Sequence, residues 1–179
     1  MICFNLKIIL ICIGKMDFIQ KYFKIRFKTN YKLMIGVNIM VKDIEIKPGE
    51  VARFSIWDIS NDTSFETLQH FYYKGALGAF LIFDISKRHS FELIKNHHNQ
   101  IQQIFGKNFP FLLIGNGPNL LKVYSDAIYC NKPREFAKKQ GCIYIENPFK
   151  LESKTNKAFV KLARQCIQMK NPTKTTCNL

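Results

Sequence analysis

The chain has 179 residues, of which 47 % are hydrophobic and 22 % are charged. This is the composition of one globular domain with a sizeable core, and it excludes a disordered chain. The net charge is +14, which suits anionic membrane surfaces or nucleic acids. The lysines are spread along the chain, however, and no nucleic-acid-binding motif accompanies them, so we expect no nucleic-acid binding. A solvated basic surface is the simplest interpretation, and weak contact with an anionic membrane surface comes next.

The first half of the chain predicts three strands. Residues 7–12 are a continuous apolar run typical of a buried strand, and residues 18–23 follow with helical spacing. Strands at residues 38–46 and 52–58 flank Pro48-Gly49, a pair that favours a tight turn. This hairpin is the one antiparallel step that we expect.

The second half alternates strands with helices. The predicted elements are a strand at residues 78–85, a helix at 91–105, a strand at 110–115, a helix from Pro133, a strand at 142–145 and a closing helix that ends near Gln168. This order predicts an α/β fold in three layers, with helices on both faces of a six-stranded, mostly parallel sheet.

The cysteines and the apolar start of the chain bear on its location. Six cysteines occur without a C-x-x-C pair, which indicates reduced, mostly buried thiols of a cytoplasmic protein. The apolar stretch at residues 1–13 is too short to span a bilayer, so a buried strand explains it better. Cys177 resembles a prenylation cysteine but lies one residue too close to the end, so we expect peripheral membrane contact at most.

Four stretches carry a family signature. They are Ile35-Gly36-Val37-Asn38-Ile39, Ile56-Trp57-Asp58, Tyr72-Tyr73-Lys74-Gly75-Ala76 and Phe83-Asp84-Ile85-Ser86. In this order they resemble the Ras superfamily of small GTPases, and the Rab branch within it. The resemblance implies a P-loop GTPase-like domain over residues 1–168, followed by a polar tail at 169–179. It also implies GTP or GDP with Mg²⁺ as ligands, and protein effectors as partners in trafficking or signalling.

The phosphate loop and the first switch of that family are altered. The family pattern G-x-x-x-x-G-K-[ST] is about three residues short here, since only Gly14 and Lys15 remain. Met16 replaces the Ser or Thr that binds Mg²⁺, and Met34 replaces the Thr of the first switch. A thioether is a poor ligand for a hard cation. Lys15 could keep a phosphate contact, although a solvated lysine is the commoner outcome.

The second switch and the base-recognition motifs are altered as well. Asp58 is kept and could touch the water shell of a metal ion or cap its loop. Asn61 replaces the Gly that closes on the γ-phosphate, and Asp62 replaces the Gln that orients the attacking water, so we expect no catalytic residue. Asn116 is kept and could bind a base or tie two loops together. Asn119 replaces the Asp that reads guanine and would suit xanthine better.

The resemblance therefore implies a vestigial nucleotide site and an effector surface. The last motif reads Pro148-Phe149-Lys150, in which Phe149 could still offer its N–H to a base. The predicted nucleotide site consists of Gly14, Lys15, Met16, Met34, Asp58, Asn61, Asn116, Asn119, Phe149 and Lys150. The predicted effector surface consists of Ile35, Gly36, Val37, Ile39, Trp57 and Tyr72, although the two aromatics could equally belong to the core.

Four functional hypotheses stay open from the sequence. The first is an effector-binding module in which GTP binding is weakened or lost and hydrolysis is absent. The second is an active or slow GTPase, as the family implies. The third is a nucleotide switch without hydrolysis, and the fourth is a decayed or misread gene.

Overall fold

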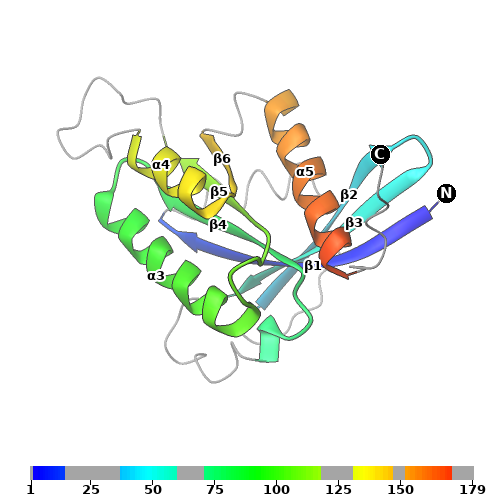
Figure 1. Cartoon of the computed structure of the whole chain (residues 1–179), viewed down its shortest axis with the longest axis horizontal. Helices are drawn as coiled ribbons and strands as arrows, with labels where there is room; N and C mark the ends of the chain where they lie inside the picture. The colour runs from blue at the N-terminus through cyan, green and yellow to red at the C-terminus, as the bar shows by residue number, and fades with distance from the viewer. Residues whose placement is uncertain (1, 15–36, 60–70, 118–130, 147–151, 171–179) are drawn as a thin grey trace.

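The structure is a computed structural model that describes residues 2–14, 37–59, 71–117, 131–146 and 152–170. The described residues form a six-stranded sheet in the order β2-β3-β1-β4-β5-β6 (Figure 1). Its strands are β1 (Ile2–Ile13), β2 (Val37–Lys47), β3 (Glu50–Ile59), β4 (Gly78–Asp84), β5 (Phe111–Asn116) and β6 (Ile143–Glu146). Within this sheet only β2 and β3 pair antiparallel. The expected fold class is confirmed.

The β2–β3 hairpin turns where the sequence predicts it. Gly49 has φ 82, a left-handed conformation that glycine adopts without steric cost. Asp43 and Arg53 face each other across the two strands, and the guanidinium donates to both carboxylate oxygens at 2.7 and 2.8 Å. This bidentate ion pair is exposed, so it contributes to the register of the hairpin more than to the stability of the fold.

Three described helices cover the sheet: α3 (Arg88–Phe105), α4 (Asn131–Gln140) and α5 (Glu152–Lys170). Figure 1 shows α5 crossing one face of the sheet, while α3 and α4 lie together on the other side of the picture. The packing agrees with this view, because the buried residues of α5 belong to one apolar cluster and those of α3 and α4 to another.

The alternation of side chains along the strands fills both clusters. In β1, Leu6, Ile8 and Leu10 point toward α5, and Ile9 and Ile11 point toward α3. All five are at most 1 % exposed. Because both faces are covered, β4 and β5 carry no polar side chain before their last residues, as is usual for parallel strands.

Most element boundaries differ from the prediction by one to three residues, such as the start of α3 at Arg88, and the start of β1 differs most. β1 begins at Ile2, five residues earlier than expected, because residues 2–10 pair with β3. The polar side chains of Asn5 and Lys7 hide this extension in the hydropathy pattern. α5 ends at Lys170, two residues beyond the expected end of the domain. No helix of the described part of the chain is long and apolar enough to cross a membrane.

Candidate functional site

Polar residues gather at the carboxyl edge of the parallel strands. β1, β4 and β5 are neighbours, and they end at Ile13, Asp84 and Asn116 (Figure 1). Ligands of open α/β sheets bind outside this edge. Of the predicted nucleotide site, the structure describes Gly14, Asp58 and Asn116 and brings them to this edge or next to it. The remaining predicted positions lie outside the described residues: Lys15, Met16, Met34, Asn61, Asp62, Asn119, Phe149 and Lys150.

Gly14 follows β1 directly, without an intervening loop. The pairing of β1 with β4 continues through Ile13, which lies opposite Phe83. Gly14 then takes φ 132, and a Cβ at this position would lie only 3.0 Å from the Cβ of Asp84. A phosphate loop needs a run of free backbone N–H groups after the strand. The part of the chain that the structure describes contains no such run, because β1 stays in the sheet up to Ile13.

Asp58 is a buried carboxylate with one unsatisfied oxygen. It is 4 % exposed and lies opposite Asn38 in the antiparallel ladder. Burial raises the pKa of Asp58 to about 6, and a hydrogen bond with the Asn38 side chain acts in the opposite direction. The Oδ1 atom of Asp58 has no hydrogen-bond partner among the described residues. Leaving a buried acceptor unsatisfied is costly, so a cation or a donor would complement this oxygen.

The carboxylate of Asp84 is hydrogen-bonded within the turn between β4 and α3. Its Oδ1 accepts hydrogen bonds from the backbone N–H of Ser86 at 2.9 Å and from the Ser86 hydroxyl at 2.5 Å. The Ser90 hydroxyl donates to the Asp84 carbonyl oxygen at 2.8 Å. The sequence-based site does not include Asp84, although the Asp-x-Ser spacing is a signal for such a turn. Its role at this edge is therefore to fix the backbone.

Cys12 is close to both of these carboxylates. Burial raises the pKa of its thiol to about 12, and the charges of Asp58 and Asp84 act in the same direction. The thiol therefore stays protonated at neutral pH and is neither a nucleophile nor a ready metal ligand. Within the described ranges, no group of three or more His, Cys, Asp or Glu residues could hold a metal ion.

Asn116 is the last residue of β5 at the carboxyl edge, and Gly117 follows it. Asn116 is 9 % exposed, and its backbone carbonyl oxygen accepts a hydrogen bond from the Ile85 N–H at 2.8 Å. Its side-chain Oδ1 has no partner among the described residues. A Cβ on Gly117 would lie 2.5 Å from Cγ1 of Ile85. Ile85 therefore occupies the space that a side chain at position 117 would need.

Part of the predicted effector surface comes together on the α3 side of the sheet. Ile39 and Trp57 are cross-strand partners, and the rings of Trp57 and Tyr72 are 6.3 Å apart. Tyr72 and Val37 are 8 % and 4 % exposed, whereas Ile39 and Trp57 are half-buried. This cluster therefore has a buried inner part and an accessible rim. The predicted positions Ile35 and Gly36 lie outside the described residues.

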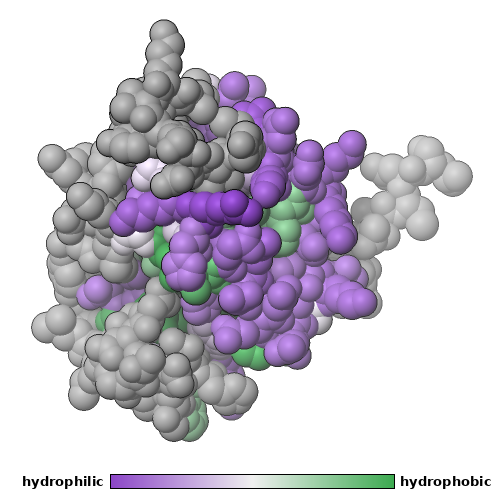
Figure 2. All heavy atoms as spheres, turned by 90° about the vertical axis from the view of Figure 1, so that its left-hand side faces the viewer, coloured by the Kyte–Doolittle hydropathy of each residue, from purple (hydrophilic) through white to green (hydrophobic). Residues whose placement is uncertain are grey.

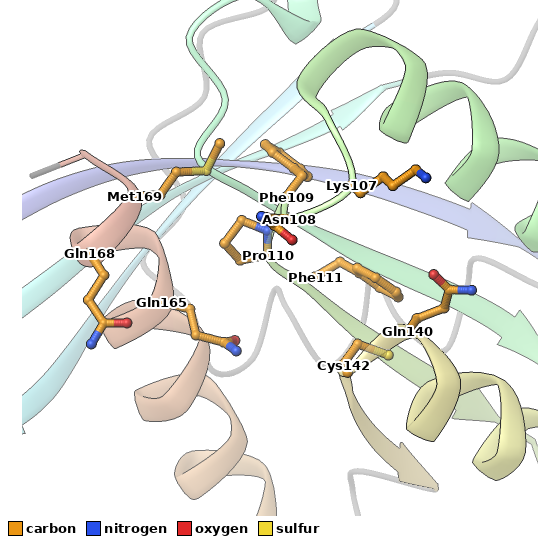
Figure 3. A pocket seen from close by; sticks show the side chains of 11 residues that line it. Lys107, Asn108, Phe109, Pro110, Phe111, Gln140, Cys142, Gln165, Gln168 and Met169 are labelled. Carbon is orange, nitrogen blue, oxygen red and sulfur yellow. The ribbon is translucent and has the colours of Figure 1, made fainter. Parts of the chain in front are cut away.

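A cavity of about 460 Å³ lies at the opposite, amino edge of the sheet (Figure 3). Its walls come from the loop before β5, the end of α4 and the last turns of α5, and include Phe109, Gln140, Gln165 and Met169. None of the predicted nucleotide-site or effector residues that the structure describes lines this cavity. It is therefore not the site that the sequence predicts.

The ligands implied by the resemblance, GTP or GDP with Mg²⁺, match this geometry only in part. Asp58 has the chemistry of a Mg²⁺ ligand, since carboxylate oxygens are hard donors. The pairing of β1 through Ile13 leaves no phosphate cradle among the described residues, and Ile85 fills the space over Gly117. Among the described residues Asp58 has the chemistry of a Mg²⁺ ligand, and the phosphate-binding positions of the family motif at Lys15 and Met16 lie outside them.

Comparison with known families agrees with the fold. A family model described as the Ras family matches residues 7–168, which runs from β1 almost to the end of α5. Members of this family are small GTP-binding proteins that generally bind GTP or GDP with Mg²⁺ and act on protein effectors. The sheet order, the single antiparallel pair and the residues at the carboxyl edge are consistent with that match. The chain belongs to the Ras family and is a small GTP-binding-protein domain.

Proposed function

We propose that this chain is a Rab-like member of the family that serves as an effector-binding module in trafficking or signalling, with GTP binding weakened or lost and hydrolysis absent. One observation carries the proposal: β1 remains paired through Ile13, and Gly14 and Lys15 follow at once. A chain that leaves the sheet so late has few backbone N–H groups to surround a phosphate. Met16 and Met34, at the positions of the two family hydroxyls, support the same conclusion.

The cluster around Trp57 supports a role in binding proteins. Aromatic side chains in partly buried positions contribute a large share of the energy at protein interfaces. Phe71 precedes Tyr72 and is 68 % exposed, so an apolar side chain stands in solvent beside this cluster. A partner with an apolar anchor would bury Phe71 and the rim of Trp57 together. A soluble protein with peripheral membrane contact would suit such a role.

A second candidate is an active or slow GTPase, and a specific observation favours it. Asp58 and Asn116 occupy positions that the family motifs keep, and one side-chain oxygen of each is buried without a partner among the described residues. Buried polar atoms of this kind are usually satisfied, so a bound cation and a nucleotide would account for both. Turnover would then need a phosphate cradle made by the backbone after Ile13.

Thermal unfolding with nucleotides separates the two candidates. The midpoint of the purified chain would be measured with GDP, GTP and XTP at millimolar concentration, with and without Mg²⁺. A bound ligand must stabilise the fold, by about 2.7 kcal/mol at a hundredfold excess over Kd. The binding-module proposal expects no rise with any nucleotide. A Mg²⁺-dependent rise with GTP or GDP that Asn116→Ala abolishes would refute it, and a rise with XTP alone would assign a changed base preference to Asn119.

A further inference from the structure

A second cavity of about 460 Å³ lies between α4, β6 and α5. Its volume is within the range of small-molecule sites. None of Gly14, Asp58, Asp84 and Asn116 lines it, whereas Glu146 at the carboxyl end of β6 does, so the cavity lies beside the described ends of β1, β4 and β5. Among the described residues, its charged lining consists of Arg134, Lys138, Lys154 and Glu146.

The three cations of this cavity come from two helices that face each other across β6. Arg134 and Lys138 are one turn apart on α4, and the buried Ala137 lies on the same side of the helix. Lys154 lies in the first turn of α5, where the helix dipole adds partial positive charge. An anion in the cavity would therefore have positive groups on both sides.

Glu146, the one carboxylate among the described lining residues, is already paired with a cation. Glu146 accepts a hydrogen bond from the Tyr144 hydroxyl at 2.9 Å, and Arg134 Nη2 contacts its two oxygens at 3.3 and 3.2 Å. Lys138 and Lys154 form no salt bridge with any described residue, and both are exposed. Two ammonium groups are therefore available for a ligand.

The surroundings of the cavity are positive as well. The described exposed side chains of α4 and α5 outside its lining include Lys132, Lys139, Lys157 and Lys161, and Glu135 is the one carboxylate among them; the side chain of Glu152, also on α5, is not described. Figure 2 shows the side of the molecule that carries α3 and α4, and its described surface is mostly hydrophilic. Charges of one sign around a hollow raise the local concentration of the opposite ion. The same positive charges repel a cationic ligand, so a cation is not the expected occupant.

We propose that the α4–β6–α5 cavity binds a small ligand with two or more phosphate groups, such as the head group of an inositol phosphate. Lysine ammonium groups bind phosphate as point charges, and the guanidinium of Arg134 can add a directed contact. A ligand with several phosphates offers a separate anionic group to Lys138 on α4 and to Lys154 on α5, whereas a single carboxylate offers only one. The ligand could be free in solution or attached to a lipid, and the inference does not depend on the proposed function.

The test is calorimetric titration of the full chain with two probes. One probe is soluble inositol trisphosphate, and the other is vesicles of neutral phospholipid that carry a phosphoinositide, compared with vesicles of equal surface charge made with phosphatidylserine. The pocket variant Lys138→Gln/Lys154→Gln should weaken binding at least about tenfold, since hydrogen bonds to charged groups are the strong ones. The matched control, Lys132→Gln/Lys157→Gln, removes two charges from the same helices outside the cavity. Its Kd for the probe should stay within about twofold of the parent value.

The outcomes separate the possible sources and the possible failures. Pocket-dependent binding of the soluble probe supports a free phosphorylated ligand, and pocket-dependent binding of the phosphoinositide vesicles supports a lipid head group. An equal loss in the pocket and control variants would mean a diffuse basic surface and would overturn the proposal. Absence of binding to both probes would also overturn it, as would displacement of the probe by GDP or GTP, which would assign the cavity to a nucleotide site. All four substituted side chains are exposed, so both variants should unfold at the temperature of the parent chain.

Discussion

The ammonium group of Lys7 lies 3.7 Å from the centroid of the Trp57 ring. The same Nζ donates a hydrogen bond to the backbone carbonyl of Lys74 at 2.9 Å. Lys7 is on β1 and Trp57 is on β3, while Lys74 follows the segment that holds Tyr72. One side chain therefore joins three separate segments around the predicted effector surface, and partial burial lowers its pKa.

Replacing Lys7 should loosen this cluster. Lys7→Met keeps the apolar stem but removes the cation–π contact and the hydrogen bond, so we expect the free energy of unfolding to fall by about 1–2 kcal/mol. Trp57 is the one tryptophan of the sequence, so its fluorescence reports the change directly. Urea unfolding gives the free energy of unfolding when it is followed by circular dichroism, and tryptophan emission reports the change around Trp57.

Lys74→Met is the matched control for that variant. Lys74 takes part through its backbone carbonyl, and its side chain is exposed, so the substitution should change stability by no more than about 0.5 kcal/mol. An equal fall in the free energy of unfolding of the two variants would show that removing any nearby lysine has this effect. That result would contradict a specific role of Lys7.

Removing the charge of Asp58 should stabilise the fold at neutral pH. The pKa of Asp58 is raised to about 6 from its ordinary 3.8, so ionising it costs more in the folded state than in the unfolded state. This cost is absent below about pH 4, grows as the pH rises and is complete above about pH 7. A shift of about two units corresponds to at most about 3 kcal/mol. Asp58→Asn, which can still pair with Asn38, should gain up to this amount at pH 7.

The measurement is urea unfolding of both proteins over a range of pH. The parent chain should lose stability relative to Asp58→Asn between about pH 4 and pH 7, and Glu135→Gln, at an exposed position, should follow the parent. A destabilised Asp58→Asn at pH 7 would instead indicate that the ionised carboxylate has a favourable partner, as a bound cation would provide.

The sequence was sufficient to predict the main elements of the described fold, because apolar periodicity and turn residues act locally. Pro48-Gly49 and the apolar runs that became β4 and β5 are examples. The start of β1 was not predictable in this way, because its first residues are held by pairing with β3, some fifty positions later in the chain. The family motifs predicted Gly14, Asp58 and Asn116 as nucleotide-site residues; the structure places them at or next to the carboxyl edge, and their binding of a nucleotide stays a prediction.

Details of the site depended on register and burial, which no local pattern encodes. The sequence could not reveal that Lys7 covers Trp57, since the two residues meet only through the parallel pairing of β1 with β3. It also could not reveal that Asp58 and Asn116 each keep an unpartnered oxygen. Ile85 and Gly117 are likewise brought together by the pairing of β4 with β5.

His98 should make the fold sensitive to mild acid. It is 1 % exposed and lies between the rings of Phe111 and Phe136, at centroid distances of 4.7 and 5.2 Å. Neither ring nitrogen makes a hydrogen bond of good geometry with a described residue; burial lowers the pKa of His98, and the nearby Asn99 side chain acts in the opposite direction. The unfolded chain binds a proton near pH 6.5 that the folded chain resists, so stability should fall as the pH drops below about 6.5.

The variant that checks this is His98→Phe, which keeps an aromatic ring in the cage. Its unfolding free energy should vary less between about pH 7 and pH 5 than that of the parent chain. His89→Gln, at an exposed position of the same helix, should leave the parent profile unchanged. If His98→Phe and the parent lost stability in parallel, the acid sensitivity would have to come from another group, such as the half-buried His97, whose pKa burial also lowers.

Restoring a lysine at position 117 should destabilise the chain instead of repairing the base-recognition motif. The Cβ of Gly117→Lys would lie 2.5 Å from Cγ1 of Ile85, so one of the two residues must move. Overpacking of this kind costs about 1–3 kcal/mol. Ile85→Ala would free the space, so the double variant should be more stable than the sum of the two single changes predicts. Thermal unfolding of the four proteins gives the coupling, and additive effects would mean that Ile85 does not restrict this position.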